Sequence, residues 1–143
     1  MTPFDSAETL APQILAPVID RAINAGVPIL TANGNTGESY SLTTPEAERM
    51  VHSVAELIDG RVSLVGGVAH SIADSLTLAR ASREAEAAAL MVHQPPDPFV
   101  APRGMLTYVQ RIAETARHRR SYSISATTRS GWTLSNSLAK FQA

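Results

Sequence analysis

The residues of this chain best suited to holding a small anion form the pentapeptide Gly34-Asn35-Thr36-Gly37-Glu38. The two glycines permit a tight turn and let backbone N–H groups approach a ligand, while Asn35 and Thr36 add side-chain donors. This combination favours a carboxylate or a phosphate. The alternative is a purely structural turn, in which Asn and Gly only satisfy backbone angles. The spacing matches neither a nucleotide phosphate loop, since no lysine follows the glycines, nor a dinucleotide fingerprint.

Two other loops carry residues that could contact a ligand. Gly66 and Gly67 end an apolar run, where they either admit a ligand or reflect crowding in a sheet. His93 follows a further apolar run, where it could contact a substrate or stabilise its own loop. Neither His52 nor His70 makes a credible metal pair with His93, and the chain has no cysteine, so we expect no metal site and no bound cofactor.

The elements that must position these loops alternate between strand and helix. Short apolar runs typical of buried parallel strands occupy 27–31, 61–68 and 87–92. Apolar residues at helical spacing predict helices over about 17–25, 44–59, 71–83 and 103–116. In the second of these helices, Thr44 is the expected N-cap, followed by Pro45 and an acidic first turn.

This alternation predicts an α/β fold with a parallel sheet and right-handed crossovers. The sheet is either open and doubly wound or part of a (β/α)₈ barrel, and periodicity does not choose between them. Both architectures place ligand sites at the carboxyl ends of the strands. The candidate site therefore consists of the loops that follow Thr31, Val68 and Val92.

Length and composition limit the class of protein. The 143 residues suit one domain, and the 5% of aromatic residues fits helices on an aliphatic sheet better than a β-sandwich. No apolar run approaches the roughly 20 residues of a membrane span, and the first residues lack a signal-peptide pattern. We therefore expect a cytoplasmic chain with no membrane partner.

The charge distribution changes near residue 117. All thirteen acidic residues lie in 1–114, whereas 115–143 holds five basic residues, of which Lys140 is the chain's only lysine. Such a basic, Ser/Thr-rich tail could be an interaction arm or sequence foreign to the preceding domain. It has few aromatic residues and no recognisable nucleic-acid-binding module, so we expect no nucleic-acid partner.

Taken in order, the motifs resemble the dihydrodipicolinate synthase and N-acetylneuraminate lyase family, most closely its sugar-acid dehydratase-like branch. They are Thr2-Pro3-Phe4-Asp5, Gly34-Asn35-Thr36-Gly37-Glu38-Ser39, Gly60-Arg61-Val62 leading into Val65-Gly66-Gly67-Val68, and Gly104 after a proline-rich loop. The resemblance covers residues 2–116. It implies about the first half of a (β/α)₈ barrel, in a family whose late lysine forms a Schiff base with pyruvate or a related 2-oxo acid.

The resemblance also implies roles for residues. Asn35 and Thr36 would bind the substrate carboxylate, and His93 is a further substrate-facing candidate. Asn35 stands where many members carry Ser or Thr, and Pro95 and Pro96 stand where synthases carry a tyrosine. The resemblance also implies that the parent enzyme would be a homo-oligomer, because members of the family form homo-oligomers. No catalytic residue is expected in this chain, because its one lysine lies in the tail.

We therefore divide the chain into a partial barrel domain, 1–116, and a poorly structured tail, 117–143. The family's fifth strand should begin where the chain reads His118-Arg119-Arg120. A shifted reading frame would restore a plausible apolar strand there, so we hypothesise a frameshift near residue 117, and the coding DNA tests it. The implied lyase would then be an inactive fragment. The alternatives are a small lyase completed by another chain and a non-catalytic binding or scaffold fragment.

Overall fold

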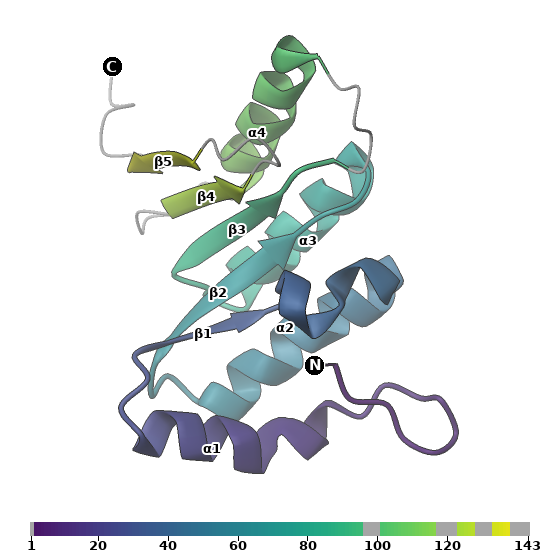
Figure 1. Cartoon of the computed structure of the whole chain (residues 1–143), viewed down its shortest axis with the longest axis vertical. Helices are drawn as coiled ribbons and strands as arrows, with labels where there is room; N and C mark the ends of the chain where they lie inside the picture. The colour runs from purple at the N-terminus through teal and green to yellow at the C-terminus, as the bar shows by residue number, and fades with distance from the viewer. Residues whose placement is uncertain (1, 96–100, 117–122, 128–132, 138–143) are drawn as a thin grey trace.

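The computed structural model describes residues 2–95, 101–116, 123–127 and 133–137. Five strands form one sheet in the order β1-β2-β3-β4-β5 (Figure 1). The strands are β1 (Ile29–Ala32), β2 (Ser63–Val68), β3 (Ala89–His93), β4 (Ser123–Thr127) and β5 (Thr133–Ser137). The α-helices are α1 (Ala16–Asn24), α2 (Thr44–Ile58), α3 (Ile72–Glu84) and α4 (Pro102–Ala116), with short 3₁₀ helices at Pro12–Leu15, Asn35–Gly37 and Ser39–Ser41.

Strands β1 to β3 are parallel, as the alternating pattern predicts, and β4 continues the parallel arrangement. Leu30 pairs with Leu64 between β1 and β2, and Gly66 pairs with Leu90 between β2 and β3. The three predicted apolar runs all form strands, although each strand begins two residues later than expected, and β3 extends to His93. The earlier residues of each run belong to the connection that leads from a helix end into the sheet.

The two faces of the sheet differ in burial. Side chains that point toward the helices are fully buried, including Leu64, Val68, Leu90 and Val92, each at most 5% exposed. On the opposite face, Ile29 is 53% exposed. The core therefore lies between the sheet and the helices, and α2 and α3 lie behind β1–β3 in Figure 1.

Helix α2 begins one residue earlier than its expected cap implies. The N-cap is Thr43, not Thr44, and it forms a capping box with Glu46. The Thr43 hydroxyl and N–H both donate to the Glu46 carboxylate, at 2.7 and 2.8 Å, and these two hydrogen bonds lower the Glu46 pKa. A capping box requires the acid at the third helical position, and only Thr43 has an acid at that distance.

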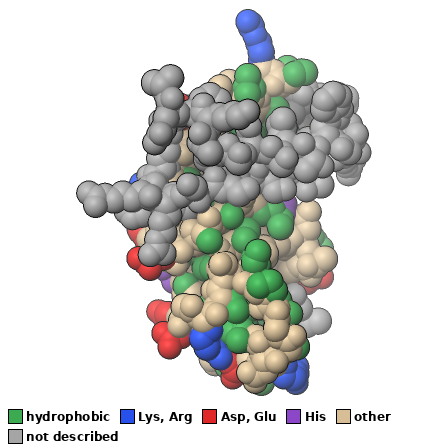
Figure 2. All heavy atoms as spheres, turned by 90° about the vertical axis from the view of Figure 1, so that its left-hand side faces the viewer, with side chains coloured by type: hydrophobic (Ala, Val, Ile, Leu, Met, Phe, Trp, Pro, Cys, Tyr) green, Lys and Arg blue, Asp and Glu red, His purple; other side chains and the backbone are tan. Residues whose placement is uncertain are grey.

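The edge of the sheet at β1 carries exposed apolar side chains. Val27 and Ile29 on this edge and Ile14 and Val18 on the nearby helical segment are 37–53% exposed. In the face shown in Figure 2, hydrophobic side chains gather in the middle, with acidic and basic side chains at the margins. An exposed sheet face beside an unpaired edge is what part of a barrel presents before it closes.

Two segments of the predicted tail form strands. β4 pairs parallel with β3, with Leu90 and Ile124 as backbone register partners, and β5 pairs antiparallel with β4. The residues at 117–122, 128–132 and 138–143, including Lys140, lie outside the described part of the chain. The division of the chain at 116/117 stays a prediction.

Candidate functional site

The turn after β1 has the conformation of a small, well-fixed loop. Residues Asn35–Gly37 form one turn of 3₁₀ helix, closed by a hydrogen bond from the Gly37 N–H to the Gly34 carbonyl at 3.0 Å. Glu38 follows in the left-handed region, with φ of 60°. The Thr2 hydroxyl also donates to the Gly37 carbonyl at 2.6 Å. Asn35 and Thr36 are both exposed.

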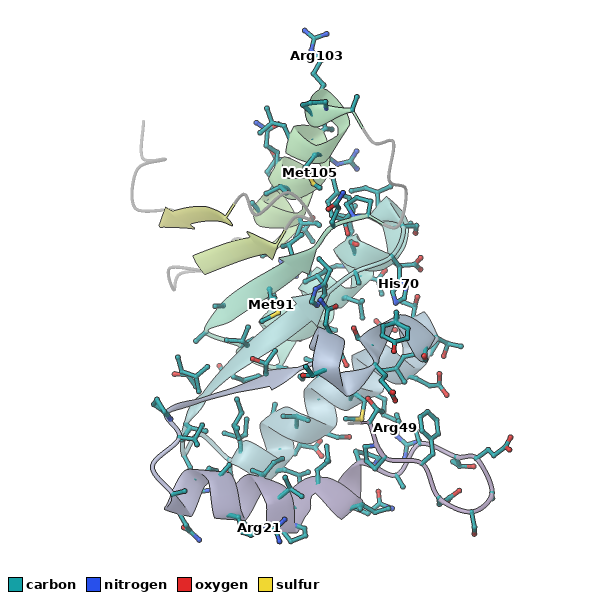
Figure 3. The ribbon with its side chains drawn as sticks, in the orientation of Figure 1. Arg21, Arg49, His70, Met91, Arg103 and Met105 are labelled. Carbon is teal, nitrogen blue, oxygen red and sulfur yellow. The ribbon has the colours of Figure 1, made fainter. Side chains whose placement is uncertain are left out.

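This turn borders a pocket of about 360 Å³ at the carboxyl end of β1. Its wall combines the turn, β1, the side of α2 and one residue of β3. The lining residues are Thr2, Leu15, Thr31, Ala32, Asn33, Gly34, Asn35, Thr36, Gly37, Met50, Val54 and Met91. Figure 3 shows Met91 on β3 and His70 beyond the carboxyl end of β2. The pocket thus has polar donors on one side and apolar side chains on the other, as small-molecule sites usually do.

Asn33, which the motif analysis did not single out, links this turn to the core. It is 8% exposed and has a φ of 57°, in the left-handed region. Its side-chain amide donates to the carbonyl of Ala47 in α2 at 2.9 Å. The signal available in the sequence was an Asn between an apolar strand and Gly34, because Asn tolerates left-handed angles better than most residues.

His93 lies beside the turn but is buried, at 8% exposure. Its Nε2 is 3.3 Å from the backbone carbonyl of Asn33. A carbonyl oxygen only accepts, so this nitrogen carries the proton, and Nδ1 of the neutral ring is an acceptor. Burial lowers the pKa of His93, and the hydrogen bond to Asn33 opposes this shift. The structure therefore brings His93 to the same strand end as Asn35 and Thr36, on the backbone side of the turn.

The two adjacent glycines of β2 are explained by crowding. A Cβ at Gly66 would overlap the Ser82 side chain of α3, and one at Gly67 would overlap the backbone carbonyl of Asn33. Both glycines have ordinary negative backbone angles, so close approach and not conformation requires them. Of the two interpretations left open by the sequence, crowding holds, and at Gly67 the crowding element is the candidate site itself.

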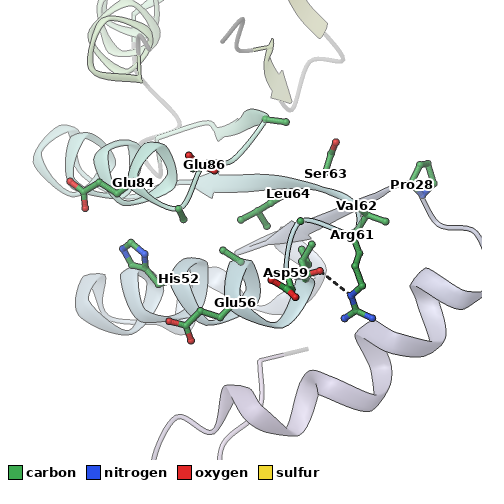
Figure 4. Close-up of a pocket in the computed structure, with 15 residues that line it drawn as sticks. Pro28, His52, Glu56, Asp59, Arg61, Val62, Ser63, Leu64, Glu84 and Glu86 are labelled. Carbon is green, nitrogen blue, oxygen red and sulfur yellow. Dashed lines mark hydrogen bonds between the residues drawn. The ribbon is translucent and has the colours of Figure 1, made fainter. Parts of the chain in front are cut away.

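A second, larger hollow of about 810 Å³ lies at the amino ends of the strands. Figure 4 shows its polar side chains, which come from the second half of α2, from the end of α3 and from the loops that follow these helices. They include His52, Glu56, Asp59, Arg61, Glu84 and Glu86. This hollow is on the side away from the strand ends where (β/α) folds bind ligands, and its acids would repel an anion.

The described residues contain neither a cluster of metal ligands nor a helix that could cross a membrane. No group of three His, Cys, Asp or Glu side chains within them is arranged to hold a metal ion. Among the same residues, no helix has the length and apolar character needed to cross a membrane.

The fold and the position of the pocket define a partial (β/α)₈ barrel with its candidate site at the carboxyl ends of the strands. The family model described as "Dihydrodipicolinate synthetase family" matches residues 1–135. The chain belongs to this family. The match extends past residue 117 into the segment that contains β4 and β5.

Curated relatives agree with this assignment. The 4-hydroxy-tetrahydrodipicolinate synthase of Salinibacter ruber is 31% identical over 117 residues, which are 81% of this chain and 39% of that protein. The enzyme of the same name from Bacillus subtilis is 30% identical over 114 residues, with 79% and 39% covered. The matched region thus spans about two-fifths of the length of these relatives.

Solved structures show the same partial overlap. The dihydrodipicolinate synthase of Oceanobacillus iheyensis is 27% identical, with a TM-score of 0.79 over 91% of this chain and 43% of that one. YagE, an Escherichia coli K12 protein of the same family solved in complex with pyruvate, has a TM-score of 0.78 over 86% of this chain and 41% of that one, at 22% identity. An N-acetylneuraminate lyase from Mycoplasma synoviae has a TM-score of 0.77 over 87% and 43%, at 21% identity.

Proposed function

We propose that this chain binds the carboxylate of a small 2-oxo acid such as pyruvate at the turn Gly34–Gly37, as the carboxylate-binding part of a Schiff-base lyase. One observation carries the proposal: the exposed Asn35 and Thr36 side chains border the pocket at the carboxyl end of β1. A carboxylate accepts hydrogen bonds from an amide and a hydroxyl, and charge-assisted bonds of this kind are the stronger ones. The pyruvate complex of a family member supports the substrate class.

His93 is the third proposed substrate-facing residue. It lies at the carboxyl end of β3, and the acceptor character of its Nδ1 suits a substrate hydroxyl or a protonated group and not a carboxylate. We expect a weaker contact from His93 than from Asn35 and Thr36, because His93 is buried and its imidazole is bonded to the Asn33 carbonyl. The homo-oligomeric state of the parent enzyme stays a prediction of the resemblance.

The chemical step of the proposed lyase needs a lysine amine. A neutral amine adds to the ketone of a 2-oxo acid and loses water, and the protonated imine that forms withdraws electrons from the neighbouring carbon. Lys140 is the only lysine of the chain and is outside the described residues. We therefore propose that the 143-residue chain binds a 2-oxo acid without forming the imine.

Borohydride trapping tests this proposal. The chain is incubated with pyruvate, reduced with sodium borohydride, and analysed by intact mass and peptide mapping, with binding followed in parallel by ligand-observed NMR. We expect pyruvate binding and no covalent adduct. A stable adduct on Lys140 would contradict the proposal that the chain forms no imine. An absence of pyruvate binding would contradict the proposed carboxylate site.

A further inference from the structure

We propose that Asn33 is the positioning residue of the turn at Gly34–Gly37, because it ties that turn to three separate elements of the fold. The inference rests on the proposed carboxylate site, since it assigns a role in forming that site to a residue that touches no substrate. Asn33 lies directly between the end of β1 and Gly34, so its backbone conformation sets the direction in which the turn leaves the sheet.

The backbone of Asn33 is in the left-handed region. A φ of 57° is unfavourable for most residues because the Cβ approaches the following carbonyl, and Asn is among the few that tolerate it. With this angle the chain bends from the extended β1 into the 3₁₀ turn that contains Asn35 and Thr36. A residue that prefers negative φ would redirect the turn.

The side chain of Asn33 fixes the bend to helix α2. Its Nδ2 donates to the Ala47 carbonyl at 2.9 Å in a buried contact. Its Oδ1 is also buried and has no hydrogen-bond partner within the described residues. Burying an unpaired acceptor is costly, so packing alone would favour an apolar side chain here. The tether to α2, together with the left-handed backbone, accounts for an asparagine at this place.

The carbonyl of Asn33 is fixed from the other side. The His93 imidazole of β3 donates to it at 3.3 Å, and Gly67 of β2 leaves just enough room for it, since a Cβ there would overlap it. A peptide group held in this way cannot rotate freely, so the turn that follows it is ordered before a ligand arrives. Preorganised donors bind more tightly because ordering costs less when the ligand binds.

The test compares variants of the whole 143-residue chain without and with pyruvate. Asn33→Ala removes the tether and the tolerance of left-handed angles, whereas Asn33→Gly removes only the tether. Asn24→Ala, at an exposed residue near the end of α1, is the matched control. Amide NMR signals of residues 34–37 report the turn directly, and pyruvate titration reports the site.

We expect Asn33→Ala to shift the amide signals of 34–37 and to weaken pyruvate binding about tenfold. A tenfold change corresponds to the free energy that roughly one hydrogen bond contributes to ordering the turn. Asn33→Gly should shift the same signals less, and Asn24→Ala should leave them in place. Unchanged turn signals in folded Asn33→Ala would overturn the inference. If Asn33→Ala does not fold, unchanged turn signals in Asn33→Gly would overturn it.

Substitutions of His93 test its hydrogen bond to the Asn33 carbonyl independently. His93→Gln retains an N–H donor that can reach the Asn33 carbonyl, whereas His93→Phe has none. We expect the ligand-free turn signals to stay near their wild-type positions in His93→Gln and to move in His93→Phe. Equal movement in both variants would contradict a positioning role for this hydrogen bond. These signals need no ligand, so the inference is judged separately if the unmodified chain fails to bind pyruvate.

Discussion

The pocket at the carboxyl ends of the strands and the hollow at their amino ends differ in size and in charge. The first has about 360 Å³ and is lined by exposed donors and apolar side chains. The second has about 810 Å³ and is lined by four carboxylates, with His52 and Arg61. The larger hollow therefore suits an anion less well than the smaller pocket does.

The two regions also differ in how their backbone is held. The turn at the carboxyl end is fixed by buried contacts through Asn33, His93 and Gly67. At the amino end, Arg61 donates to the carbonyls of Leu57 and Ile58 and pairs with Asp20 at 2.9 Å, in contacts that are exposed or only partly buried. The two regions therefore differ in the burial of the contacts that hold their backbone.

Gly67→Ala should have the largest effect. The added methyl group meets the Asn33 carbonyl, which is backbone and cannot swing away, so we expect a loss of about 2–3 kcal/mol in the free energy of unfolding. Urea denaturation followed by circular dichroism measures it. Gly34→Ala is the matched control: its methyl group meets only Thr31 at 3.6 Å, and its change should stay within about 0.5 kcal/mol. Equal losses would show that the close approach at Gly67 is not important.

Thr36→Val should weaken pyruvate binding, whereas a change in the amino-end hollow should not. The substitution keeps the shape of the side chain and removes its hydroxyl, so we expect about a tenfold or greater weakening of pyruvate binding, because a hydrogen bond to a charged group is lost. Titration by NMR measures it. Glu56→Gln changes a carboxylate of the amino-end hollow and should leave pyruvate affinity as it was. If Glu56→Gln has the larger effect, pyruvate binds at the amino ends of the strands and not at the proposed carboxyl-end site.

The pH dependence of stability should report the burial of His93. Burial lowers the pKa of His93 in the folded state, so the unfolded chain takes up a proton more readily. The stability that His93 contributes is therefore complete above its ordinary pKa of about 6.5 and is lost as pH falls through the lower, folded value. Urea midpoints between pH 5 and 8 should fall less steeply in His93→Gln than in the unmodified chain. Parallel curves would contradict this account.

Arg61→Met should have the smallest effect, at the amino end. The side chains of Arg61 and Asp20 are 41% and 53% exposed, and exposed ion pairs contribute about 0–1 kcal/mol. We expect a loss below about 1 kcal/mol in the free energy of unfolding, including the contacts to the end of α2. Asp20→Asn gives the share of the ion pair alone. A loss as large as that of Gly67→Ala would remove the contrast between the two ends.

The sequence by itself determined the order of the elements and the location of the candidate site. Strand and helix periodicities depend on local alternation of apolar residues, so the β–α repeat and the loops after each strand were predictable. Within residues 2–116 the errors concerned boundaries, such as the cap of α2 at Thr43, because adjacent residues there have similar capping preferences. Strands β4 and β5 were not among the predicted elements. The turn at Gly34–Gly37 was found for the same local reason, since Gly and Asn mark tight turns.

Only the tertiary structure decided how the turn is held. The contacts of Asn33 join residues 14 and 60 positions apart in the chain, to Ala47 and His93. Local patterns carry no information about such pairs, because the distance between them depends on how strands and helices pack. The same holds for Gly67, whose lack of a side chain looked like either a ligand site or crowding until the Asn33 carbonyl was placed against it. The residues of a loop determine which chemical groups it offers to a ligand. Its rigidity depends on contacts with neighbours that the fold brings together.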